Sequence, residues 1–384
     1  MKAKTYRLGE LCRMVKGTSP TMKTEPGSYP LVVTAAFRRT ADSWQLEGPA
    51  VCIPLVSSTG HGDAALHRVH YQEGKFALAN LLVALLPNDP SACDAKYLYH
   101  LLMTQKDELL VPLMQGTANV SLKEQDIAEV EISLPPFAEQ RRVVARIEEL
   151  AAQIYEARTL RHQATEEAEA LFEASVGKWF IELSKSPTRK LETLASKIGS
   201  GSTPSGGRAS YPSSGIPFIR SMNVRMRRFQ WDDIAYISPD THKSMSGTNV
   251  RPRDVLLNIT GASIGRVTCA PEDIAEANVN QHVAIIRPKE DLEARYLMYW
   301  LSQPTVQEFI NDEQKGATRQ GFTKAQIQAF EIPVPTLTEQ RRIVAELDAL
   351  QAEVDALKRL QAETATELDA LLPAILDQAF KGEL

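Results

Sequence analysis

Four arginines and one asparagine gather within ten residues of the second half of the chain. The stretch at residues 220–229 contains Arg220, Asn223, Arg225, Arg227 and Arg228. A guanidinium forms two parallel hydrogen bonds with guanine or contacts phosphate, and an asparagine amide pairs in the same way with adenine. The spacing therefore predicts a nucleic-acid contact element, with an exposed basic strand face as the plain alternative.

Polar side chains of the same kinds occur elsewhere in both halves. In the second half we expect further contacts at Asn258, Arg266, Asn280, Gln281 and Arg319. In the first half the candidates for DNA contact are Arg38, Arg39, His61, His67, Arg68 and Lys75. Each is a weak indication alone, because such residues are common on protein surfaces.

Catalytic motifs nearly match and then fail. The run Leu-Pro-Pro-Phe at residues 134–137 lacks the polar first residue that an amino-methyltransferase motif of this kind needs to bind the amino group. Gly207 stands where a phosphate-binding loop needs lysine. No strong zinc spacing is present in the densest histidine cluster, which comprises His61, Asp63, His67 and His70. We therefore expect no catalytic residue and no metal in this chain.

Composition bounds the class of protein. The net charge of −5 does not by itself indicate nucleic acid, although residues 188–334 hold 18 Lys and Arg against 15 Asp and Glu. No apolar run reaches the roughly 18 residues of a membrane span, and the first 20 residues lack the apolar core of a secretory signal. The four cysteines are far apart. We expect a cytoplasmic protein with free thiols and no membrane partner.

The chain repeats itself. The run Glu-Gln-Arg-Arg at residues 139–142 returns at residues 339–342, in each case after a proline-bearing strand end and before a long helical pattern. Leu8, Leu11 and Val15 similarly match Leu191, Leu194 and Ile198. A period this long is not a solenoid unit. It predicts two halves, each a globular domain followed by a helix, with interiors that diverge between the shared anchors.

The two helical segments carry matching apolar seams with a 3-4 spacing, which is typical of a coiled coil. We expect helix pairing through Ile147, Leu150, Ile154, Arg161 and Leu171 in one helix and through Leu347, Leu350, Val354, Leu357, Gln361, Leu368 and Leu371 in the other. Arg161 and Gln361 are polar residues in the same register, which can fix helix orientation. Pro373 is expected to stop or kink the second helix.

The predicted fold class is therefore α+β. Two mixed α/β domains at residues 1–134 and 188–334 would be separated by two long antiparallel helices, at 135–187 and 335–384, that form a coiled coil with pseudo-two-fold symmetry. In the alternative arrangement each helix packs only on its own domain. A helix over residues 138–172 would be about 50 Å long.

These features together resemble the specificity subunit of type I restriction–modification systems. The resemblance spans the whole chain and rests on the two Glu-Gln-Arg-Arg runs with their preceding prolines. It also rests on the Gly-x-Ser/Thr-Pro turns at 17–20 and 201–204 and on the segments at 58–62, 280–282 and 371–384.

The resemblance implies two target-recognition domains that each read one half of a gapped DNA target, with the helices as spacer. The implied partners are double-stranded DNA, two methyltransferase (modification) subunits and restriction/translocase subunits. S-adenosylmethionine, ATP and magnesium would then reside on those subunits. A coiled-coil scaffold with two protein-binding domains, and a self-sufficient methyltransferase, remain as alternatives.

Overall fold

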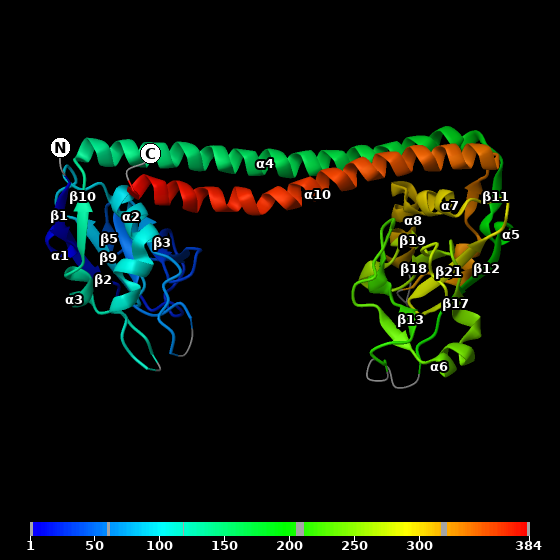
Figure 1. The fold of residues 1–384 in the computed structure, drawn as a ribbon, viewed down its shortest axis with the longest axis horizontal. Helices are drawn as coiled ribbons and strands as arrows, with labels where there is room; N and C mark the ends of the chain where they lie inside the picture. Colours follow the sequence, from blue (N-terminus) through cyan, green and yellow to red (C-terminus); the bar gives the residue numbers. More distant parts are fainter. Residues whose placement is uncertain (1–2, 60–61, 118, 205–210, 316–320, 382–384) are drawn as a thin grey trace. The chain divides into compact units, whose positions relative to one another are not determined.

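The computed structural model describes residues 3–59, 62–117, 119–204, 211–315 and 321–381. The chain divides into two compact units: Met1–Arg161 with Ala362–Leu384, and His162–Gln361. Each unit holds one half of the sequence repeat, and the two long helices, α4 (Phe137–Glu182) and α10 (Leu337–Lys381), contribute to both (Figure 1).

Unit 1 is built on two four-stranded sheets, with strand orders β2-β9-β6-β7 and β4-β3-β8-β5, and a two-stranded ribbon β1-β10. Its strands are β1 (Lys4–Arg7), β2 (Cys12–Lys16), β3 (Tyr29–Val32), β4 (Arg39–Ala41), β5 (Leu46–Glu47), β6 (Ala50–Pro54), β7 (His70–Gln72), β8 (Lys75–Leu78), β9 (Leu82–Pro87) and β10 (Glu131–Leu134). Its helices besides α4 and α10 are α1 (Leu8–Leu11), α2 (Ala95–Leu109) and α3 (Glu124–Ala128), with the 3-10 turn η1 (Val111–Leu113).

Unit 2 repeats this frame. The sheet β12-β21-β18-β19 corresponds to β2-β9-β6-β7, the sheet β16-β13-β20-β17 to β4-β3-β8-β5, and the ribbon β11-β22 to β1-β10. Its strands are β11 (Thr188–Lys190), β12 (Ala195–Ser200), β13 (Ile216–Ile219), β14 (Val224–Arg225), β15 (Arg228–Phe229), β16 (Ala235–Ile237), β17 (Asn249–Val250), β18 (Val255–Asn258), β19 (Val267–Cys269), β20 (Ala277–Val279), β21 (Val283–Pro288) and β22 (Glu331–Pro333). Its helices are α5 (Leu191–Leu194), α6 (Pro239–Ser244), α7 (Ala294–Ser302), α8 (Pro304–Lys315) and α9 (Lys324–Gln328), with 3-10 turns at Leu183–Lys185, Ser221–Asn223, Ser246–Thr248 and Gly261–Ser263.

The central strands are apolar throughout because both of their faces are buried. In β6, Val51 and Ile53 face the core beneath α2 and α4, whereas Ala50 and Cys52 face the core between the two sheets. Strand β18 alternates in the same way between the corresponding cores of unit 2. This layering, helices on sheet on sheet, confirms the predicted mixed α/β domains. The apolar runs at 30–33, 50–53, 81–85, 254–257 and 282–286 overlap strands β3, β6, β9, β18 and β21.

The repeated Glu-Gln-Arg-Arg run joins each long helix to its domain. Gln140 is fully buried. Its Nε2 donates to the carbonyls of Ala92 and Pro135, each at 2.9 Å, and its Oε1 accepts the N–H of Asp94 at 2.9 Å. Gln340 makes the same three kinds of bond in unit 2, with Asp291, Pro335 and Glu293. The motif is repeated because the same helix–domain junction is built twice.

Antiparallel pairing of α4 with α10 is present in each unit, as predicted. In unit 1, Arg161 donates to Thr364 Oγ1 at 2.7 Å. In unit 2, Thr165 donates to Gln361 Oε1 at 2.7 Å. Partners later in α4 are earlier in α10, so the helices run in opposite directions, and both predicted polar seam residues bond across the pair.

The structure corrects the seam at two positions. Leu171 is 61% exposed and Leu371 is 45% exposed, so neither lies between the helices. After Ala168 the buried residues of α4 follow a spacing of four, through Phe172, Val176 and Phe180, which join the core of unit 2. A change from 3-4 to 4-4 spacing rotates the buried stripe around α4, so Phe172 takes the place predicted for Leu171. In α10 the residues beyond Leu371 that pack on the domain of unit 1 are Ile375, Leu376, Ala379 and Phe380.

Both helices lie within the segments predicted for them, 135–187 and 335–384, and α4 runs ten residues beyond the helix expected over residues 138–172. Helix α4 extends to Glu182 because Phe172, Val176 and Phe180 pack on the domain of unit 2. Helix α10 continues through Pro373, which is exposed, and does not stop there. None of the helices described combines the length and apolar character needed to cross a bilayer.

Candidate nucleic-acid interface

Arg227, the centre of the predicted contact element, faces the long helices. It lies in the turn of the β14–β15 hairpin with a φ of 59°. Its Nη2 is 2.8 Å from Glu173 Oε1, its Nε donates to Gln351 Oε1 at 3.1 Å, and its guanidinium lies 4.5 Å from the Phe172 ring centre. Only 13% of the side chain is exposed. Arg227 therefore fixes the hairpin on α4 and α10, and the prediction that it contacts DNA has no support from its position.

Two further residues of that element hold the domain together. Asn223 is fully buried, accepts from the backbone N–H of Arg220 and donates to the carbonyls of Gln230 and Asp232. Arg220 donates through Nη2 to the Asp233 carbonyl. Amide groups used completely inside a domain are not available to adenine, so Asn223 is a structural residue.

Asn258 and Asn280 are also interior. Asn258 is fully buried and donates to the Ser221 carbonyl at 2.8 Å and to Ser263 Oγ at 3.2 Å. Asn280 accepts the backbone N–H of His282 at 3.1 Å. Both amides shape loops around them and do not face solvent.

The remaining predicted residues of unit 2 do reach the surface. Arg225 and Arg228 are exposed on neighbouring strands of the hairpin, and Arg225 donates to Gln230 Oε1 at 2.7 Å. Gln281 is exposed, and Arg266 is partly so. Arg319 lies outside the described residues.

Arg266 borders a polar hollow of about 430 Å³ within unit 2. The hollow is lined by Ser221, Thr260, Gly261, Ala262, Ser263, Arg266 and His282. Three hydroxyls, an imidazole and a guanidinium thus surround one depression, which offers donors and acceptors of the kinds that read base edges or hold phosphate.

The hydrogen bonds of His282 determine what the hollow presents. Its Nε2 lies 3.0 Å from Gln281 Nε2, which can only donate, so the imidazole Nε2 accepts. The proton is then on Nδ1, which lies 2.5 Å from Thr260 Oγ1 and donates to it. The Thr260 hydroxyl proton is not used in this bond, so the hydroxyl can donate it to a ligand in the hollow.

Unit 1 places its predicted residues differently. Arg38 donates to Gln72 Oε1 at 3.0 Å and to the Tyr71 carbonyl at 3.0 Å, and contacts His70 Nδ1 at 3.2 Å. Arg39 donates to the Thr21 carbonyl. Both arginines therefore brace loops.

The surface candidates of unit 1 are His67, Arg68 and Lys75. His67 and Lys75 are exposed and Arg68 is partly so, and the Lys75 ammonium lies 4.8 Å from the centre of the exposed Trp44 ring. His61 lies outside the described residues. Within the described parts of the chain, no three His, Cys, Asp or Glu side chains gather as a metal site would require.

Two polar positions of the hollow are apolar in unit 1. In unit 2 the backbone N–H of Ile259 bonds the His282 carbonyl at 2.9 Å, and in unit 1 that of Leu55 bonds the Leu81 carbonyl at 2.8 Å. The next residue along each chain segment is Thr260 in unit 2 and Val56 in unit 1. The shared frame thus sets Val56 and Leu81 in the places of Thr260 and His282.

A family model for the type I restriction modification DNA specificity domain matches residues 2–164 and again residues 185–364. The chain belongs to this specificity family. The specificity chain is 24% identical over 335 residues to the EcoBI specificity subunit of Escherichia coli, covering 80% of this chain and 69% of that protein. It is 23% identical over 171 residues to the StySPI specificity subunit of Salmonella potsdam, covering 44% of this chain but only 36% of that protein.

Solved structures agree. The HsdS subunit from Thermoanaerobacter tengcongensis superposes with a TM-score of 0.61 at 25% identity, over 100% of this chain and 97% of that one. A chain from a study of complex assembly and conformational transition of the type I R-M system superposes with a TM-score of 0.71 at 26% identity, over 100% and 98%.

Sequence reasoning missed part of the hollow of the specificity chain. Thr260, Ser263 and His282 were not among its predicted contacts, although His282 directly follows the predicted Asn280 and Gln281. The available signal was the divergence between the halves: a threonine and a histidine occupy frame positions where the other half has valine and leucine.

Proposed function

We propose that this specificity chain reads a bipartite, gapped DNA target, one half-site with each domain. The observation that carries the proposal is the contrast at one frame position: Thr260 and His282 in unit 2, Val56 and Leu81 in unit 1. A shared scaffold with unlike surface chemistry at the same place suits two domains of the same family that read different bases.

In unit 2, the residues around the hollow supply base selection. Arg266 offers a guanidinium, the commonest partner of guanine O6 and N7, and the Thr260 hydroxyl donates to an acceptor on a base edge. Arg225 and Arg228, which are exposed on the β14–β15 hairpin, contact phosphates. Phosphate contacts supply affinity without sequence information, and base-edge contacts supply choice.

In unit 1, Val56 and Leu81 suit an apolar base feature such as the thymine methyl group, which is read by van der Waals contact in the major groove. Leu81 is 39% exposed, enough to make such a contact. His67, Arg68 and Lys75 provide polar and cationic groups for the backbone of the same half-site.

The long helices supply the spacing. Helices α4 and α10 contain 46 and 45 residues, so each is about 70 Å long at a rise of 1.5 Å per residue. Their length would determine how many unread base pairs separate the half-sites. The Arg161–Thr364 and Thr165–Gln361 bonds hold the helices in one register, so that this length is constant.

Chemistry would be supplied by partners. In this proposal two methyltransferase (modification) subunits carry S-adenosylmethionine, restriction/translocase subunits carry ATP and magnesium, and the specificity chain is itself non-catalytic. The burial that raises the pKa of the Cys52 thiol to about 12 keeps that potential nucleophile protonated, in keeping with this role.

Two apolar residues on each long helix recur at equivalent places and suit partner docking. Leu160 and Leu360 are 58% and 56% exposed, and Leu171 and Leu371 are 61% and 45% exposed. Exposed leucines on both halves of a duplicated helix would give two copies of one partner the same contact.

Methylation mapping in a host that expresses the chain with its modification subunits tests the proposal. We expect methylated adenines in a site of two short sequences separated by unread positions, and replacement of residues 188–334 by the domain of another family member should alter one half only. A continuous site, or a change in both halves, would contradict two independent readers.

A further inference from the structure

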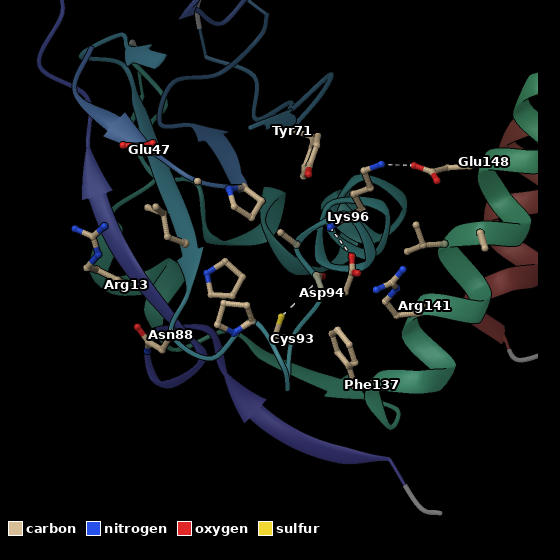
Figure 2. Close-up of a pocket in the computed structure, with 18 residues that line it drawn as sticks. Arg13, Glu47, Tyr71, Asn88, Cys93, Asp94, Lys96, Phe137, Arg141 and Glu148 are labelled. Atoms are coloured by element: carbon tan, nitrogen blue, oxygen red, sulfur yellow. Dashed lines mark hydrogen bonds and ion pairs between the residues drawn. The ribbon is translucent and has the colours of Figure 1, made fainter. Parts of the chain in front are cut away.

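Two pockets occupy corresponding places in the two units, each where a long helix begins beside its domain. The pocket of unit 1 has a volume of about 690 Å³ and includes Asn88, Asp94, Phe137, Arg141 and Glu148 in its lining (Figure 2). The pocket of unit 2, of about 420 Å³, is lined at the matching positions by Lys289, Glu293, Leu337 and Arg341. The pocket is thus part of the duplicated frame and not of the divergent interiors.

The repeated Glu-Gln-Arg-Arg run places one arginine at each pocket. The glutamine of the run is buried and makes all its hydrogen bonds within the helix–domain junction. The last arginine pairs with the glutamate of the same run: Arg142 Nη2 lies 2.8 Å from Glu139, and Arg342 Nη2 lies 2.7 Å from Glu339. Both outer members of the motif, and the buried glutamine, therefore have a partner within the chain.

The remaining arginine of the run, Arg141 or Arg341, has no side-chain partner of this kind. Arg141 and Arg341 are exposed and line their pockets, and their guanidinium groups form no hydrogen bond or ion pair with any residue that the structure describes. Their backbones are nevertheless held in place, because each follows directly a glutamine that is fixed by three hydrogen bonds. A positioned guanidinium without an acid is prepared to bind a carboxylate from outside the chain.

Several of the neighbouring charges are paired within the chain. In unit 1, Lys96 Nζ lies 2.6 Å from Glu148 Oε1. In unit 2, Arg287 pairs with Asp254 at 2.7 Å and Arg253 with Glu293 at 2.5 Å. Other charged side chains line each pocket as well, and the feature that the two pockets share is the guanidinium of Arg141 or Arg341; the other charges are Arg13, Glu47 and Asp94 in unit 1 and Arg251, Lys289 and Glu290 in unit 2.

We propose that the two pockets are equivalent anchor points, each of which takes a carboxylate-bearing segment of one modification subunit. The inference rests on the proposed function for the existence of that partner. A partner present in two copies needs two equivalent binding places, and the two pockets have an arginine and an apolar residue at equivalent positions. Phe137 and Leu337 add an apolar wall for the segment that carries the carboxylate.

DNA phosphate fits the pockets less well. Acidic and cationic side chains both line the pockets, three against three in unit 1 and three against five in unit 2, so charge alone does not separate phosphate from carboxylate. Phosphate contacts, however, need no apolar wall. A protein segment with one carboxylate and apolar neighbours matches the mixed lining.

Native mass spectrometry of the full chain, co-expressed with its modification subunit, tests the assignment. The wild type should carry two modification subunits. Arg141→Glu and Arg341→Glu should each leave one firmly bound copy, with the second weakened about 10- to 100-fold as expected for loss of a charged hydrogen-bonded pair. The double variant should lose both. Lys178→Glu, an exposed charge reversal on α4 outside both pockets, should retain two.

Folding and DNA binding complete the design. Thermal unfolding checks that each variant is folded, and Arg141→Lys and Arg341→Lys, which keep the charge, should recover most of the affinity. Retention of two firmly bound subunits by the double glutamate variant overturns the anchor assignment while leaving the proposed function intact. Unchanged stoichiometry with a weaker, salt-dependent DNA affinity would assign the pockets to phosphate instead. A wild-type chain that binds neither modification subunits nor a specific DNA site would refute both proposals.

Discussion

Arg158 on α4 donates to Asp369 on α10, with 2.5 Å between Nη2 and Oδ1. The residues 200 positions away, Lys358 and Glu169, form the equivalent ion pair in unit 2. Exchange of the two halves therefore maps one ion pair onto the other. Opposite charges at equivalent places on two antiparallel helices favour this register over its neighbours, at little cost in burial.

The first prediction concerns this register. Asp369→Arg should lower the free energy of unfolding by up to about 1 kcal/mol, because exposed ion pairs contribute little and the change sets two arginines side by side. The exchanged variant, Arg158→Asp with Asp369→Arg, should regain most of that loss at low salt and less of it at high salt. Urea unfolding of the four chains gives the coupling free energy. A coupling free energy of zero at low salt would mean that this ion pair does not help to fix the register of the two helices.

The second prediction concerns the helix–domain junctions. Gln140→Ala and Gln340→Ala should each cost about 2–4 kcal/mol, because a buried N–H and two buried carbonyls lose their partners. Arg142→Ala is the matched control, since it removes an exposed pair two positions away and should cost no more than about 1 kcal/mol. Denaturant unfolding measures both. Equal losses for the glutamine and arginine variants would mean that the junction does not depend on these bonds.

The third prediction separates structural from contacting residues in unit 2. Arg228→Ala should leave stability unchanged and reduce the slope of log K against log salt by about 1, as loss of one phosphate contact does. Asn223→Ala should do the reverse: it should lower stability by about 1–3 kcal/mol through unsatisfied buried groups. Salt titrations of DNA binding by the assembled complex, with thermal unfolding, distinguish the two. A change of salt slope for Asn223→Ala alone would invert our assignment.

The fourth prediction concerns pH. Burial, followed by the nearby Arg38 and Arg68, lowers the pKa of His70 to about 4. The unfolded histidine titrates near 6.5, so between these values the unfolded state binds the extra proton. The neutral, buried His70 therefore makes its full contribution to the free energy of unfolding above about pH 6.5. That free energy falls by roughly 3 kcal/mol as the pH drops to about 4. Urea unfolding across this window should show a shallower pH dependence for His70→Gln. If His70→Gln leaves the pH dependence of the free energy of unfolding unchanged, groups other than His70 cause the acid sensitivity.

The duplicated frame could be predicted from the sequence because each half repeats the same junction and core positions. The roles of individual polar residues could not. Asn223 and Asn258 have the chemistry that reads adenine, but a backbone carbonyl satisfies an amide equally well, and only burial distinguishes the two uses. Leu171 fits the 3-4 spacing, yet its apolar neighbour Phe172 fits a 4-4 spacing and is the one that is buried. The packing surface of the domain selects between them, and that surface is not local in sequence.

The last prediction tests the helices as spacer. Insertion of seven residues into each helix, at matched places on either side of the Arg161 and Gln361 register, lengthens both by about 10.5 Å while preserving the apolar seam. At about 3.4 Å per base pair this corresponds to roughly three additional unread positions. Both half-site sequences should stay the same, because the domains are untouched. Insertion into α4 alone is the control: it breaks the register of the pair and should lower stability without producing a new defined gap. Methylation mapping reads both outcomes, and a gap that stays constant in the doubly lengthened chain would show that something other than helix length separates the half-sites.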